Sequence, residues 1–168
     1  DTRLKAEIAG GVDTRLCYAI EDLVEEMAKE GEDRFDYIII DCGPRLDMTT
    51  TNAIVALEAG NNASHIIIPI KVDGFAIAGL SQTIDTINRT AKERRRLPQH
   101  WKILQTMIER KTSAYKVGCE LLKEAIPNAE YFNTKIEKST VVPEASLAME
   151  PLITYAPDSK PGMQYRLL

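Results

Sequence analysis

The stretch that decides the fold class reads Phe35-Asp36-Tyr37-Ile38-Ile39-Ile40-Asp41-Cys42-Gly43-Pro44. Three consecutive isoleucines after a tyrosine are typical of a strand that is buried on both faces, as in the middle of a parallel sheet. Asp41 comes where this strand would leave the core, and Gly43-Pro44 forces the chain to turn there. We therefore predict a central strand that ends with a carboxylate at the rim of the sheet.

Two roles are open for Asp41. Ligands of open α/β sheets bind at the carboxyl ends of strands, so a carboxylate in this position predicts a Mg²⁺ ligand, direct or through water, in a phosphate-binding ATPase. Alternatively, Asp41 only caps the turn or helix that follows it. The residues alone leave both roles open.

Composition and charge exclude several classes of protein. A chain of 168 residues, 44% hydrophobic and 27% charged, fits one globular domain with a real core. With a net charge of −4, DNA binding would need a local basic patch. The odd set Cys17, Cys42 and Cys119 has neither metal-ligand spacing nor a disulfide framework, which predicts a reducing cytoplasm. No apolar run approaches the roughly 20 residues that span a bilayer.

Strands and helices alternate along the chain. We predict helices at 13–30, 49–59, 76–96 and 113–125, with Asp13 as the first N-cap and a short helix from Val142. Further strands are predicted at 64–70, 101–108 and 131–136, with weaker segments at 1–11 and 151–155. The proline at position 69 should end its ladder. This order predicts a doubly wound, mostly parallel sheet with helices on both faces.

A phosphate-binding domain normally begins with a strand and a glycine-rich loop, and no such unit occurs in this sequence. The chain also opens with Asp1 instead of methionine. We therefore expect it to be the later part of a longer protein.

A succession of motifs resembles the ParA/MinD family of deviant Walker ATPases, and ParA-type partitioning proteins in particular. In chain order these motifs lie at 37–44, 51–53, 67–70, 75–80, 104–112, 133–136, 142–145 and 151–160. The resemblance implies a P-loop NTPase-like fold that lacks its first βα unit. Residues 1–168 would then be the C-terminal two-thirds of a single ParA-like ATPase domain.

The resemblance also implies an activity. A ParA-like partition ATPase binds ATP and Mg²⁺, forms an ATP-dependent homodimer, binds DNA nonspecifically, and is stimulated by a ParB-type centromere-binding protein during plasmid or chromosome segregation. Such a protein would be cytoplasmic and nucleoid-associated, without membrane attachment. Asp41 matches the Walker B acid, as metal ligand and catalytic residue. Since the family's lysine-bearing glycine-rich loop would precede Asp1, this segment alone is expected to be inactive.

The cofactor-binding residues that the resemblance implies are Thr106, Met107, Glu137 and Val142. Thr106 and Met107 could line an adenine pocket or simply end a strand against the core. The family usually has Pro-Arg where Glu137-Lys138 stands, and proline where Gly43 stands.

Two basic groups compete as the DNA-binding surface. The first follows neighbouring strands at the nucleotide edge, so that dimerisation would double its area; it comprises Arg110, Lys111, Lys116, Lys135 and Lys138. The second is also typical of a solvated helix end; it comprises Arg89, Lys92, Arg94, Arg95 and Arg96.

Two alternative functions and two minor roles complete the predictions. A MinD-like, membrane-associated ATPase would need a C-terminal amphipathic helix, and the end at 163–168 is too short to show one. In a receiver-like signalling domain Asp41 would act with Lys71, but no acidic pair follows a first strand here. Asp47 either caps the next helix or approaches the second nucleotide or the dimer partner. His65 and His100 are expected to be lone core or surface residues.

Overall fold

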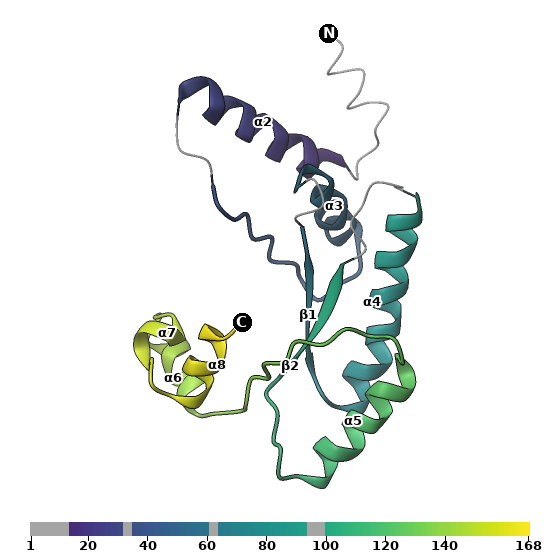
Figure 1. Ribbon diagram of the computed structural model, residues 1–168, viewed down its shortest axis with the longest axis vertical. Helices are drawn as coiled ribbons and strands as arrows, with labels where there is room; N and C mark the ends of the chain where they lie inside the picture. The colour runs from purple at the N-terminus through teal and green to yellow at the C-terminus, as the bar shows by residue number, and fades with distance from the viewer. Residues whose placement is uncertain (1–13, 32–34, 61–63, 94–99) are drawn as a thin grey trace. The chain divides into compact units, whose positions relative to one another are not determined.

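The computed structural model describes residues 14–31, 35–60, 64–93 and 100–168. They belong to two compact units, one of Asp1–His65 with Thr83–His100 and the other of Ile66–Gln82 with Trp101–Leu168. Parallel strands and many helices make the fold mixed α/β, as predicted (Figure 1). The weak strand at 1–11, the Asp13 cap and the arginines at 94–96 lie outside the described residues.

Helices dominate the first unit. Helix α2 spans Arg15–Glu30, α3 spans Met48–Ala56, and the 3₁₀ helix η2 spans Leu57–Gly60. Gly31 ends α2 in the left-handed region, at φ 70°, where glycine is favoured. A small core joins these helices, and its members are Cys17, Val55 and Ala56, with Leu16, Ile20, Ile40 and Ala59 packed against them.

The central strand predicted at Tyr37–Ile40 is not formed in this structure. Tyr37 and Ile39 are 86% and 90% exposed, and only Ile40 packs against the core of α2 and α3. A central strand needs hydrogen-bonded neighbours on both edges and cover on both faces. Among the described residues none pairs with this segment, so its apolar side chains face solvent.

The second unit contains the described sheet. Strands β1 (Ile66–Lys71) and β2 (Trp101–Thr106) run parallel, from the pair Ile66↔Trp101 to Lys71↔Thr106. The ladder does not end at Pro69 as predicted, since Pro69 lies opposite Leu104 within it. Within the described ranges β1 pairs only with β2, and a proline is tolerated on such an edge strand because its missing N–H can face away from the partner.

A third segment runs parallel beside β2 without forming a continuous strand. Two bridges hold it, Ile103↔Tyr131 and Ile108↔Glu137. Between the two bridges, the third segment advances six positions, from Tyr131 to Glu137, whereas β2 and its extension advance five, from Ile103 to Ile108. One extra residue interrupts a ladder as a β-bulge does, which explains why the strand predicted at 131–136 appears only as two bridges.

Two long helices accompany the strands. Helix α4 spans Gly74–Glu93, and α5 spans Ser113–Ala125 as predicted. The hydroxyl of Thr112 caps α5 by accepting the N–H of Tyr115 at 3.2 Å. Helix α5 lies tightly against the loop after β1, because a Cβ on Gly118 would come within 2.8 Å of Cγ1 of Val72.

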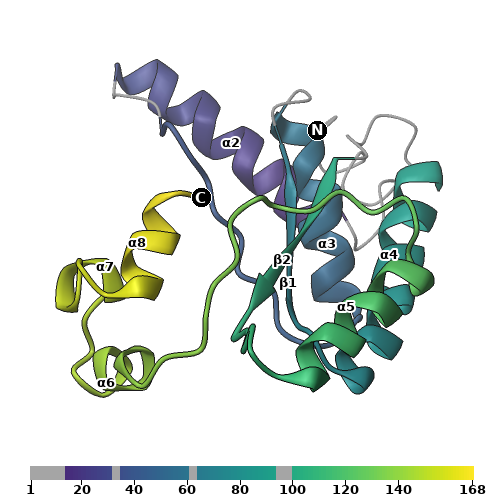
Figure 2. The same cartoon turned by 60° about the horizontal axis from the view of Figure 1, so that its bottom comes forward.

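Three short helices end the chain, α6 (Val141–Leu147), α7 (Leu152–Tyr155) and α8 (Lys160–Arg166). The edge segment predicted at 151–155 is therefore wrong, since four of its residues form α7. In the views of Figures 1 and 2 these helices cluster on one side of β1 and β2, with α5 on the other. No helix in the described part of the chain is long and apolar enough to cross a membrane.

Candidate functional site

Carboxyl ends of parallel strands meet at one edge of a sheet, and three of them meet here. β1 leads to Lys71 and Asp73, and β2 leads to Thr106 and Met107. The parallel bridge Ile108↔Glu137 brings the end of the third segment to the same place. The structure thus brings together Thr106, Met107 and Glu137, three of the four residues predicted to bind a cofactor, whereas the fourth, Val142, lies further along in the first turn of α6.

Met107 has an unusual backbone conformation at this edge. Its φ of 51° lies in the left-handed region, which costs a residue with a Cβ about 1–2 kcal/mol. Its side chain is 58% exposed, so burial does not compensate this cost locally. Such strained residues concentrate at ligand sites, which makes Met107 a reasonable member of one.

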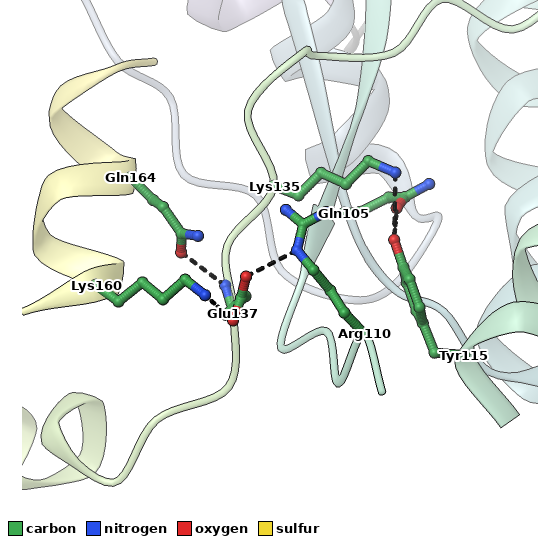
Figure 3. A network of polar contacts seen from close by, with 7 residues as sticks. All are labelled: Gln105, Arg110, Tyr115, Lys135, Glu137, Lys160 and Gln164. Atoms are coloured by element: carbon green, nitrogen blue, oxygen red, sulfur yellow. Dashed lines mark hydrogen bonds and ion pairs between the residues drawn. The ribbon is translucent and has the colours of Figure 1, made fainter. Parts of the chain in front are cut away.

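An ion-pair network surrounds Glu137 (Figure 3). Arg110 Nε donates to one carboxylate oxygen and Lys160 Nζ, from α8, to the other, both at 2.7 Å. The backbone N–H of Glu137 donates to Gln164 Oε1, also on α8, at 2.9 Å. The bond from Lys160 and then that from Arg110 hold the pKa of Glu137 below its ordinary value. Glu137 therefore anchors α8 to the end of β2.

A second ion pair lies at the same edge. Lys138 Nζ contacts Glu109 Oε1 at 2.7 Å, and this hydrogen bond lowers the pKa of Glu109. Two of the five predicted DNA-binding residues, Arg110 and Lys138, are thus already paired with acids. Lys111 and Lys116 are exposed and make no ion pair within the described part of the chain.

Lys135, the fifth predicted basic residue, belongs to a polar chain beneath this edge (Figure 3). Its ammonium donates to the Tyr115 hydroxyl at 3.2 Å, and that hydroxyl donates to Gln105 Oε1 at 2.8 Å. Gln105 is only 6% exposed, so its amide needs this partner. Burial, followed by a hydrogen bond with Cys119, raises the pKa of Tyr115 to about 12. The phenol therefore stays protonated at neutral pH and can keep donating.

The candidate acids have different surroundings. Asp47 caps α3 by accepting the N–H groups of Thr49 and Thr50 at 3.0 and 3.3 Å, which confirms the capping role. Asp41 belongs to the first unit, is exposed, and makes no ion pair with any described residue. An exposed carboxylate fits Mg²⁺, a hard cation that keeps several waters and needs few protein ligands. No larger group of His, Cys, Asp and Glu suited to a metal occurs in the described ranges.

Lys71, which the receiver-like alternative would need, pairs with Asp73 at 3.2 Å, and Asp73 in turn accepts the N–H of Ala76 in the first turn of α4. This arrangement gives the lysine a local structural partner. The two histidines were expected to be isolated from each other, but the ring centroids of His65 and His100 lie 6.0 Å apart.

Sequence reasoning missed several members of the network. Lys160 and Gln164 carry no local signal, because only the fold of the C-terminal helices brings them to Glu137. Gln105 did carry one, since a polar residue within an apolar strand requires a buried partner. That requirement points to a donor nearby but cannot identify Tyr115.

Comparison with known proteins gives consistent similarities. A family model described as "AAA domain" matches residues 10–99. The sporulation initiation inhibitor protein Soj of Bacillus subtilis is 31% identical over an alignment of 137 residues that covers 78% of this chain and 49% of Soj. The chromosome partitioning protein ParA of Caulobacter vibrioides is 26% identical over 149 residues, 89% of this chain and 52% of that protein.

An uncharacterized protein of Pseudomonas putida is 33% identical over 139 residues, 81% of this chain and 49% of its own length. The chain thus spans about half the length of these relatives. The matches to Soj and ParA cover most of this chain.

Proposed function

Because the chain belongs to the AAA-domain family of ParA/MinD-like P-loop ATPases, we propose that it is part of a partition ATPase. In this proposal the intact protein binds ATP with Mg²⁺, dimerises, and then binds DNA without sequence preference. A centromere-binding partner of the ParB type stimulates hydrolysis. The observation that carries the proposal is the similarity to Soj and ParA along most of the chain.

The proposed metal ligand is Asp41. Its carboxylate is exposed and has no ion-pair partner among the described residues, so it is available to Mg²⁺ or to a water of its shell. The bound metal would neutralise charge that develops on the phosphates. Thr106, Met107 and Val142 remain the proposed nucleotide-binding residues, and Glu137 lies at the same edge as Thr106 and Met107.

The proposed DNA surface is the basic edge after β2. Lys111 and Lys116 are exposed cations without an acidic partner in the described part. Arg110 precedes Lys111 in sequence, and Lys135 and Lys138 come from the third segment, which the bridge Ile108↔Glu137 holds beside the end of β2. DNA affinity grows with each phosphate that a cation neutralises, and a dimer doubles the number of cations. Nucleotide-dependent dimerisation would therefore switch DNA binding on.

Two variants of the intact protein test this function. Asp41→Ala should abolish ATP-dependent binding to a fluorescent DNA duplex, and ATP-dependent binding that persists would show that Asp41 does not hold the metal. Lys111→Glu should weaken DNA binding but leave ATP binding unchanged. Lys123→Glu, the same charge change on the exposed last turn of α5, is the control. Equal DNA affinity of the two lysine variants would exclude the proposed surface.

A further inference from the structure

The carboxylate of Glu137 fills a site that has the chemistry of an anion receptor. Arg110 Nε and Lys160 Nζ each lie 2.7 Å from a different oxygen of that carboxylate, so both oxygens are engaged. The Glu137 side chain is 19% exposed, while those of Arg110 and Lys160 are 50% and 64% exposed. The acid is thus held inward between two cations that solutes can reach.

Guanidinium and ammonium groups bind phosphate by the same charge-assisted hydrogen bonds with which they bind carboxylate. A phosphate group offers more oxygens, and its charge is at least equal to that of the carboxylate. Ion pairs with exposed cations are weak, because water and salt screen them. A phosphate can therefore compete with Glu137 for the same two side chains.

We propose that Arg110 and Lys160 form a phosphate-binding cradle and that the Glu137 carboxylate is its internal competitor, which must leave before a phosphate can enter. This inference deepens the proposed function and rests on it for the sources of phosphate, which are the DNA backbone and the nucleotide. Because the Glu137 carboxylate competes, phosphate binds more weakly at this edge than the number of basic residues there would predict.

The geometry keeps the third segment in place when the carboxylate leaves. Gln164 accepts the backbone N–H of Glu137, and the bridge to Ile108 uses backbone groups, so neither contact depends on the acid. Lys160 lies on α8 together with Gln164. Loss of the carboxylate therefore frees the side chains of Lys160 and Arg110 without detaching α8.

The test compares three forms of the intact protein: wild type, Glu137→Gln and Glu124→Gln. Glu124 is exposed on the last turn of α5 and makes no ion pair among the described residues, so its variant matches the charge change alone. Affinity is measured for a 30-base-pair DNA duplex across salt concentrations, and separately for ATP with Mg²⁺. Glu137→Gln should bind one of these probes about fivefold more tightly than wild type or Glu124→Gln does, because two cations are freed.

The two probes identify the source of the phosphate. Tighter DNA binding, with a log–log salt slope steeper by about 1–2, assigns the cradle to the DNA backbone. Tighter ATP binding assigns it to the nucleotide, and this result supports the cradle even if wild type binds no DNA and the proposed function fails. Adding Lys160→Gln to Glu137→Gln should remove most of the gain.

Unchanged affinity of Glu137→Gln for both probes, in a folded protein, overturns the inference and leaves the proposed function standing. If the glutamine variant does not fold, Glu137→Asp replaces it. Aspartate keeps the charge but is one methylene shorter, so it holds the two cations less closely. A smaller gain in the same direction is expected, and its absence counts against the cradle.

Discussion

Removing the hydroxyl of Tyr115 should lower the stability of the fold, whereas removing the hydroxyl of Tyr131 should not. The Tyr115 hydroxyl bonds to Gln105 Oε1 at 2.8 Å and accepts from Lys135. Tyr115→Phe leaves the amide of Gln105 buried without a partner, which costs about 1–3 kcal/mol. The Tyr131 hydroxyl is buried and has no hydrogen-bond partner within the described residues. Tyr131→Phe should therefore change stability little or raise it by up to about 1 kcal/mol.

Urea unfolding followed by the fluorescence of Trp101 measures both effects. Trp101 is the only tryptophan of the sequence and begins β2, so it reports on the unit that holds both tyrosines. If the unfolding free energies of both variants fall with urea concentration at the same slope, they should differ by about 2 kcal/mol.

The effect of Tyr115 should also depend on pH. Burial first, then the interaction with Cys119, raises the pKa of this phenol to about 12, against an ordinary value of about 10. The unfolded chain therefore loses this proton at a lower pH than the folded chain does. The advantage of wild type over Tyr115→Phe is complete below about pH 10 and declines as the pH rises towards 12.

Equal losses in the two variants, or a larger loss for Tyr131→Phe, would refute this reasoning. Either result would mean that the packing of the rings, and not the hydrogen bond to Gln105, decides the cost. A wild-type advantage that grew between pH 10 and 12 would contradict the sign of the pKa shift.

Two further predictions follow from packing and exposure. Gly118→Ala should destabilise the fold by about 1–3 kcal/mol, because its Cβ would lie 2.8 Å from Val72. Gly79→Ala should be neutral or stabilising, because the added Cβ would meet no atom within 4 Å beyond its own helix and chain neighbours; thermal unfolding that ranks the two variants in reverse would contradict the packing. Iodoacetamide should modify the exposed Cys42 before Cys17, which is 4% exposed and whose pKa burial raises to about 11; mass spectrometry showing Cys17 first would disprove this.

Local sequence signals predicted the elements that stabilise themselves locally. Helix α5 has a capping threonine at its start and an apolar face, and its bounds match the prediction. Strands β1 and β2 have buried β-branched residues and a partner in the same chain, so they form where the pattern placed them. Asp47 caps α3 as its position before a run of threonines predicts.

The apolar run at Tyr37–Ile40 shows where a pattern is insufficient. The composition of this run favours burial on two faces, but burial needs neighbouring chain on both edges, and no described residue provides it. The pattern states what the segment requires and not whether the requirement is met.

The candidate site was predicted as a set of charges at one edge and not as a set of contacts. The position of Arg110, Lys135 and Lys138 after neighbouring strands follows from the alternation of strands and helices. The pairing of Arg110 with Glu137 and of Lys138 with Glu109 depends on the bridge between Ile108 and Glu137, which are distant in sequence. Long-range contacts of this kind have no periodic signature.

The additional residue in the third segment fixes which charge faces Arg110. Side chains along an extended chain alternate in direction. The number of residues between the two bridges therefore determines which residue of the third segment lies opposite Ile108. A regular ladder from Tyr131, without the extra residue, would bring Ile136 opposite Ile108 in place of Glu137. The bulge thus presents a carboxylate to Arg110 where a regular strand would present an apolar side chain, which makes the register of this segment as important as its composition.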